Sequence, residues 1–128
     1  MLVDQILDAK GRDVAIVPST ATVAEAVAAL AEHNVGALVV SDDASTVAGI
    51  VSERDIVRGL ADGAGVLQRT VGELMATEVA TCHGRSHIDE LMNTMTAGRF
   101  RHMPVLADGR LAGIVSIGDV VKSAIDEL

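Results

Sequence analysis

The chain has 128 residues, of which 49% are hydrophobic and 1% aromatic, so its core must be built from aliphatic side chains. A formal net charge of −8 argues against the basic surfaces that bind nucleic acids or anionic membranes, although a local group of arginines can still hold a small anion. Cys82 is the only cysteine, which rules out an intrachain disulfide and fits a reducing cytoplasm. We find no signal peptide and no apolar run of the roughly 18 residues that cross a bilayer, and we therefore expect a cytoplasmic protein without a nucleic-acid or membrane partner.

The first half of the chain predicts a lead-in helix, a strand, a helix, two strands and a closing helix. Val23, Val27 and Leu30 recur at helical spacing, whereas residues 14–17 form a short apolar run typical of a strand. The polar turn at residues 42–46 indicates a hairpin-like connection between two strands. In chain order, these elements fall at residues 3–7, 14–17, 23–31, 37–41, 47–52 and 53–62. Residues 62–66 then form a small linker that we expect to be flexible.

The second half repeats this order of elements. Residues 49–58 match residues 113–122 at an offset of 64, and the upstream match has an offset of 65, with the slip in a turn. The elements of this copy fall at residues 70–75, 79–81, 88–95, 103–106, 111–116 and 117–127. We therefore predict an α/β (α+β) fold of two β-α-β-β-α repeats, residues 1–66 and 67–128, each with a mixed sheet because a helix bridges its first strand and a later one.

Both copies carry the pattern G-[IV]-V-S-x-x-D between a strand and a helix, at residues 49–55 and 113–119. Arg101-His102-Met103-Pro104-Val105 precedes the second pattern, and Leu74-Met75-Ala76-Thr77 opens the second copy. With these motifs, nearly the whole chain resembles a tandem pair of cystathionine β-synthase (CBS) domains. The resemblance implies a pseudo-two-fold module, commonly a disc-like homodimer, whose two clefts between the copies bind adenosine-containing ligands such as AMP, ADP, ATP, S-adenosylmethionine or NAD(H).

The serine and aspartate of each pattern are Ser52 with Asp55 and Ser116 with Asp119. They have two interpretations that can hold together. In the first, the serine caps the helix and the aspartate in the first turn faces the positive end of the helix dipole. In the second, which the resemblance favours, the aspartate accepts hydrogen bonds from the two hydroxyls of a ribose and the serine and helix end meet a phosphate.

We call the pairs Ser52–Asp55 and Ser116–Asp119 the serine–aspartate corners. Arginines near these corners are candidates for holding phosphate. Arg54 and Arg58 are spaced i, i+4 and share a helical face, either as a solvated surface or as a phosphate clamp. Gly118 stands at the position of Arg54, so the two sites should be unequal. The resemblance also places Arg101 or His102 near phosphate, and strand alternation should turn one of these two side chains to solvent.

An adenine base would lie against the first strand of each copy and against the strand that follows Arg101 and His102. The resemblance implies that backbone groups there read the adenine edge, and the alternative is ordinary core packing. The residues concerned are Val14, Ala15, Ile16, Val79, Ala80, Thr81, Met103 and Pro104.

Two further features bear on metals and partners. Cys82, His83 and His87 offer only three donors at irregular spacing, so we predict no metal site there, but a loop cysteine and solvated histidines. The closing helices carry wide apolar stripes that exceed what their own sheets need, which predicts a homodimer, with packing between the two copies as the alternative. The stripes comprise Ile56, Val57, Leu60 and Ala61, and Val120, Val121, Ala124, Ile125 and Leu128.

Three functions follow from these observations. The favoured one is a non-catalytic module that senses adenine nucleotides, needs no cofactor and signals to a downstream protein that the sequence does not identify. The second is a dimeric scaffold protein with vestigial clefts. The third is an enzyme akin to inosine-monophosphate dehydrogenase, which we reject because the chain has neither a barrel domain nor a nucleophile with a suitable partner.

Overall fold

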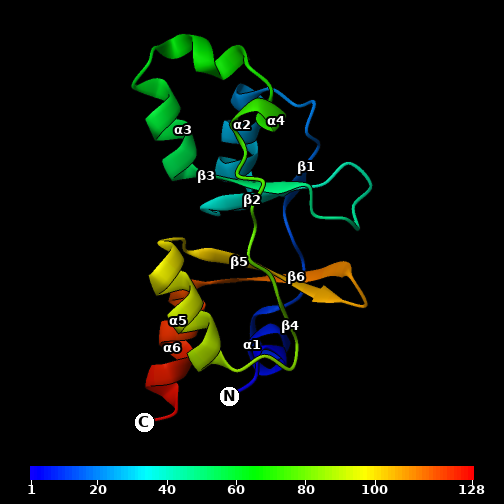
Figure 1. The fold of residues 1–128 in the computed structure, drawn as a ribbon, viewed down its shortest axis with the longest axis vertical. Coiled ribbons are helices and arrows are strands. Elements are labelled where there is room, and N and C mark those ends of the chain that lie inside the picture. Colours follow the sequence, from blue (N-terminus) through cyan, green and yellow to red (C-terminus); the bar gives the residue numbers. More distant parts are fainter. The chain divides into compact units, whose positions relative to one another are not determined.

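The computed structural model describes residues 1–128 and divides them into two compact units (Figure 1). Residues 15–79 form one, here called the central unit, and residues 1–14 with 80–128 form the other, the terminal unit. Each unit contains one three-stranded sheet and its own aliphatic core. None of the helices is long and apolar enough to cross a membrane.

The central unit has a mixed sheet in the order β1-β2-β3, as the sequence predicted. Strand β1 runs parallel to β2, and β2 runs antiparallel to β3. Helix α2 begins after Thr22, whose side chain accepts a hydrogen bond from the Glu25 N–H, and it ends at Asn34 in the left-handed conformation. In chain order the elements are β1 (Ile16–Val17), α2 (Val23–His33), β2 (Ala37–Val40), β3 (Gly49–Ser52), α3 (Glu53–Leu60), a 3-10 helix η1 (Ala64–Gln68) and α4 (Val71–Leu74).

The middle strand of this sheet, β2, is buried along its whole length, as its unbroken apolar run suggests. Leu38 and Val40 from β2 pack with Val51 of β3 and with Leu30 of α2. Val71 of α4 completes this core. The strand that leads into α3 is β3, which pairs with β2 and buries Val51 in this core, and these contacts fix where α3 begins.

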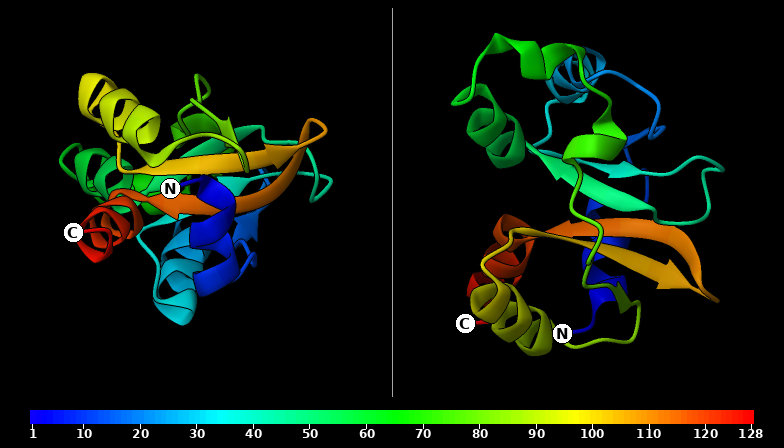
Figure 2. Two further views of the ribbon diagram at one scale, coloured as in Figure 1. Left: turned by 90° about the horizontal axis from the view of Figure 1, so that it is seen from below. Right: turned by 45° about the horizontal axis from the view of Figure 1, so that its top comes forward.

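The terminal unit repeats this topology in the order β4-β5-β6 (Figure 2). Strands β5 and β6 are joined by Asp108 and Gly109, both at positive φ, which is the backbone of a two-residue hairpin that matches strand twist. Helices α5 and α6 contact each other beside the sheet. The elements are α1 (Val3–Lys10), β4 (Cys82–His83), α5 (Ile88–Gly98), β5 (His102–Ala107), β6 (Arg110–Ser116) and α6 (Ile117–Asp126).

Helix α1 opens the predicted first repeat (residues 1–66) but packs in the terminal unit, on the sheet of the second repeat. The N–H of Val3 donates to the Ser86 carbonyl at 2.9 Å, and Leu7 is buried in the core of this unit. Leu7 lies so close to Gly113 of β6 that a Cβ there would come within 2.9 Å of its Cδ1. Helix α4, which opens the second repeat, packs in the central unit instead, so sequence repeats and compact units divide the chain differently.

Three local predictions need correction. Residues 79–81 are not a strand, because the parallel pairing with Val105 and Leu106 begins only at Cys82. The first strand is likewise shorter than predicted and comprises only Ile16–Val17. Residues 64–66 of the expected flexible linker (residues 62–66) belong to η1 (Ala64–Gln68), whose Val66 is buried against the space left by Gly59.

Candidate functional site

The two serine–aspartate corners have the same local geometry. Ser52 ends β3 and caps α3: its hydroxyl accepts from the Asp55 N–H at 3.3 Å, and the Asp55 carboxylate accepts from the Ser52 N–H at 2.9 Å. Ser116 and Asp119 make the same two bonds at 3.2 and 2.9 Å at the start of α6. The capping interpretation is confirmed, since each pair satisfies two backbone donors reciprocally.

In the central unit, Asp55 lines a cavity of about 520 Å³. Arg58, one helical turn further along α3, lines it too, and Arg69 enters from the segment after η1. Val66 and Leu74 supply apolar wall. Small-molecule sites in proteins span about 300–1,000 Å³ and combine apolar walls with a few polar groups, which this cavity does.

Arg69 was not among the residues that the sequence indicated. Its Nε lies 3.0 Å from Glu73 Oε2, and this hydrogen bond lowers the pKa of Glu73. Arg54, in contrast, lies exposed on α3 and is not one of the residues that line the cavity. The structure thus brings together Asp55 and Arg58 as predicted, and adds Arg69.

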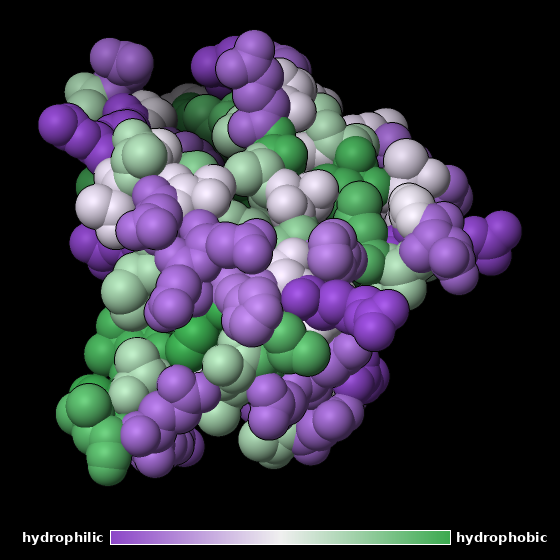
Figure 3. Space-filling model, turned by 60° about the horizontal axis from the view of Figure 1, so that its bottom comes forward, coloured by the Kyte–Doolittle hydropathy of each residue, from purple (hydrophilic) through white to green (hydrophobic).

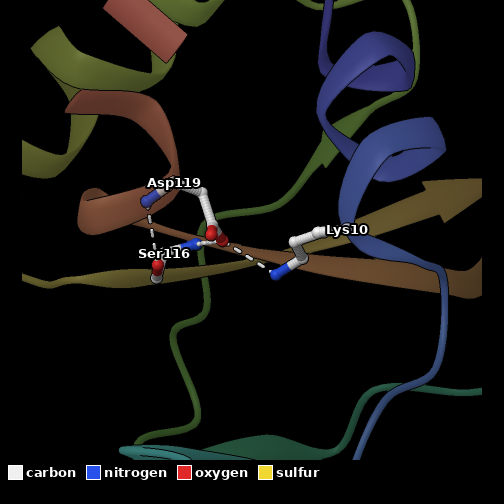
Figure 4. Close-up of polar contacts among 3 residues, drawn as sticks. All are labelled: Lys10, Ser116 and Asp119. Atoms are coloured by element: carbon white, nitrogen blue, oxygen red, sulfur yellow. Dashed lines mark hydrogen bonds and ion pairs between the residues drawn. The ribbon is translucent and has the colours of Figure 1, made fainter. Parts of the chain in front are cut away.

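In the terminal unit, Asp119 forms an ion pair with Lys10, the last residue of α1 (Figure 4). Lys10 Nζ lies 2.7 Å from Asp119 Oδ2, on the same carboxylate that accepts the Ser116 N–H. Burial raises the pKa of Asp119, whereas the hydrogen bonds from Lys10 and Ser116 lower it. Together the hydrogen bonds outweigh burial, so the pKa lies below its ordinary value. Sequence gave no signal for Lys10, which is 109 positions away.

Arg101 and His102 lie beside this second corner through the backbone. His102 begins β5 and pairs in register with Ser116, and the Arg101 carbonyl accepts from the Ile117 N–H at 2.8 Å. The Arg101 side chain is exposed and that of His102 is half-buried. The expectation that one of the two faces solvent is confirmed.

The residues predicted to hold adenine fall into two groups. Val14 and Ala15, like Val79 and Ala80, lie where the chain passes from one unit to the other, with Ile16 and Thr81 following as exposed residues. Met103 and Pro104 are buried in the middle strand of the terminal sheet, and Met103 belongs to the core of that unit.

Cys82 lies in β4, which corrects its expected loop position. Its thiol is partly buried, 3.8 Å from the Pro104 carbonyl, and burial raises its pKa to about 11. His83 and His87 are exposed. No group of three or more histidine, cysteine or acidic side chains is arranged to hold a metal ion.

A family model described as CBS domain matches the chain twice, over residues 7–62 and 71–126. The crystal structure of the CBS-domain containing protein ATU1752 from Agrobacterium tumefaciens superposes with a TM-score of 0.93 at 48% identity, covering 97% of this chain and 99% of that one. The CBS domain pair of protein MJ0100, in complex with 5′-methylthioadenosine and S-adenosyl-L-methionine, gives a TM-score of 0.88 at 26% identity and covers 100% and 98% of the two chains.

Among curated proteins, the mitochondrial CBS domain-containing protein CBSX3 of Arabidopsis thaliana is 39% identical over 111 residues. That match covers 83% of this chain and 54% of the relative, so the chain spans about half the length of the plant protein. Because the family model covers both repeats and the fold matches tandem pairs end to end, the chain belongs to the CBS-domain family and is a CBS pair, a regulatory module.

Proposed function

We propose that this CBS pair is a non-catalytic sensor that binds an adenosine-containing ligand at its serine–aspartate corners. The observation that carries the proposal is the cavity in which Asp55 stands with Arg58 and Arg69. A carboxylate can accept hydrogen bonds from both hydroxyls of a ribose, and arginine forks match phosphate oxygens. AMP, ADP, ATP, NAD(H) and S-adenosylmethionine all carry the ribose that such a corner would hold.

Similarity to MJ0100 supports this class of ligand. That protein was crystallised with two adenosine derivatives, and its fold covers the whole of this chain. The ligands in that crystal carry no phosphate, whereas the cavity described above places two arginines, Arg58 and Arg69, beside the carboxylates of Asp55 and Asp62. Because arginine forks match phosphate oxygens, we favour phosphorylated nucleotides over phosphate-free adenosine derivatives for the central unit.

The signal would pass through α3, because two of its faces have different roles. One face, with Asp55 and Arg58, lines the cavity, while Val57 and Leu60 on another face are 65% and 40% exposed. A ligand that prefers one position of α3 would shift the population of positions and so change the exposed face. A downstream protein that contacts α3 would register this change.

We further propose that the exposed faces of the closing helices form a homodimer. Val57 of α3 has a counterpart in α6, where Val121 and Ile125 are 42% and 60% exposed. Hydrophobic side chains also gather on part of the face drawn in Figure 3. Contiguous exposed apolar side chains of this kind mark interaction sites, and a two-fold axis would bring like surfaces together.

Dye-based thermal melting tests the sensor proposal, since the chain has no Trp or Tyr for intrinsic fluorescence. AMP, ADP, ATP, NAD⁺, NADH and S-adenosylmethionine are tested separately. A ligand at about 100 times its dissociation constant should stabilise the fold by about 2.7 kcal/mol, or several degrees. Asp55→Asn and Asp119→Asn form a matched pair, because asparagine keeps the shape of the cap and loses the charge.

The expected result is a shift with at least one nucleotide that shrinks in Asp55→Asn. If no compound shifts the melting temperature, the sensor proposal is wrong. The exposed apolar faces of α3 and α6 then favour the second function, a dimeric scaffold protein.

A further inference from the structure

The Lys10–Asp119 pair joins the end of α1 to the start of α6 within the terminal unit (Figure 4). The two side chains are 33% and 26% exposed, so the pair is reachable from solvent. The two other acids near Lys10 on α1, Asp4 and Asp8, bind Arg12 instead. Asp119 is therefore the acidic partner of Lys10, and Lys10 is the cation that forms an ion pair with Asp119.

The same corner in the central unit has cations on its own closing helix. Arg58 lines the cavity with Asp55 there, and its equivalent in α6 is the exposed Lys122. Arg54, which lies outside the cavity, is replaced in α6 by Gly118. Gly118 leaves the corner open, since a Cβ at that position would touch only the Ser116 hydroxyl, at 3.6 Å. The cation that the structure pairs with Asp119 comes instead from α1, as Lys10.

The pair matters for which ligand the corner accepts. A carboxylate that holds the hydroxyls of a ribose lies within about one Debye length, 8 Å, of a phosphate on the same nucleotide, so the two negative charges repel each other. Lys10 cancels that repulsion. Its ammonium group also has three donors, of which Asp119 takes one, so two are left that could serve a phosphate oxygen.

We propose that Lys10 is a specificity-determining residue of the Asp119 corner, which makes this corner prefer phosphorylated ribonucleotides over neutral nucleosides. The inference rests on the proposed function and deepens it by assigning the charge of the ligand. The lowered pKa of Asp119 agrees, because an ionised carboxylate is the acceptor that a ribose needs.

The test uses the full chain with Asp55→Asn, so that binding at the Asp119 corner is measured alone. Isothermal titration calorimetry with AMP and with adenosine compares Lys10, Lys10→Met and Lys10→Arg in that background. Methionine keeps most of the length of the side chain without its charge, and arginine keeps the charge. We expect Lys10→Met to weaken AMP binding about tenfold and to leave adenosine binding within about twofold, while Lys10→Arg keeps most of the preference.

The outcomes separate this inference from the proposal beneath it. Equal weakening of both ligands would mean a structural role for Lys10, and tighter binding of both would mean that Lys10 merely competes for Asp119; either result overturns the inference. So does a loss of all AMP binding on Asp55→Asn alone. If the unmodified chain binds neither AMP nor adenosine, the proposed function fails as well. Melting temperatures of the three variants should agree within a few degrees, because the pair is partly exposed.

Discussion

The serine–aspartate corners of the central and terminal units have the same backbone conformation and differ in the charged residues around them. Both aspartates complete a capping box with the preceding serine. Asp55 then faces a cavity with Arg58 and Arg69, whereas Asp119 is held by Lys10. All three of these cations lie outside the repeated pattern at residues 49–55 and 113–119. The motif therefore determines where a helix begins, and residues remote from it determine what each corner can bind.

The largest expected difference between the units concerns Gly49 and Gly113, which are equivalent in the repeats. A Cβ at Gly49 would lie 2.7 Å from the Ala76 carbonyl, a backbone atom that accepts from the Ile50 N–H, so it cannot easily move. A Cβ at Gly113 would meet the end of the flexible Leu7 side chain. We expect Gly49→Ala to cost about 3 kcal/mol of unfolding free energy and Gly113→Ala about 1 kcal/mol.

Urea denaturation followed by far-UV circular dichroism measures both losses. Gly109→Ala serves as a reference, because Gly109 has φ +78 and no neighbouring atom within 4 Å, so its cost is that of the backbone alone. Equal losses at Gly49 and Gly113 would show that Leu7 is held as rigidly as the Ala76 backbone.

The sequence predicted the parts of this comparison that depend on near neighbours. Helix starts at Ser52 and Ser116 follow from residues three positions apart, and the mixed sheets follow from the order of elements. Lys10 was missed because its partner is 109 positions away, and helical periodicity reports only which side chains share a face. The start of β4 was misplaced because an apolar run does not reveal which of its residues pair with β5.

The cavity residues also divide into those that the sequence could predict and those that depend on tertiary contacts. Asp55 and Arg58 are one helical turn apart, so their common face could be predicted. Arg69 joins them only because residues 64–68 coil into η1 rather than remaining a flexible linker. The folding of that segment depends on Val66 filling the space beside Gly59, which is a tertiary contact.

The second-largest expected effect concerns dimer formation through the exposed apolar faces of α3 and α6, a feature that both units have. If α3 and α6 both face a second copy, Val57→Asp and Ile125→Asp should each raise the dimer dissociation constant at least about tenfold, because each places a charge where apolar area is buried. Sedimentation equilibrium measures the constants. Val27→Asp is the matched control, since Val27 is 40% exposed and belongs to α2, which is not a closing helix.

If only one of the two substitutions raises the dissociation constant, the interface is confined to that closing helix and the two copies are not equivalent. A chain that sediments as a monomer at all concentrations would contradict the dimer proposal. In either case the ligand corners remain testable, because Asp55 and Asp119 lie on other parts of these helices than Val57 and Ile125.

The smallest expected effect is the acid sensitivity that the Lys10–Asp119 pair adds to the terminal unit. The pKa of Asp119 is lower in the folded chain than its ordinary value of 3.8. The ionised form therefore adds stability above pH 3.8, and this contribution is lost as the pH falls through the folded pKa. It should amount to less than about 1 kcal/mol, because the pair is partly exposed.

Lys10→Met should flatten the dependence of the unfolding free energy on pH below about pH 5, and Lys10→Arg should retain it. An unchanged pH profile in Lys10→Met would mean that Lys10 does not hold Asp119 in solution, and the contrast between the two corners would then rest on Arg58 and Arg69 alone.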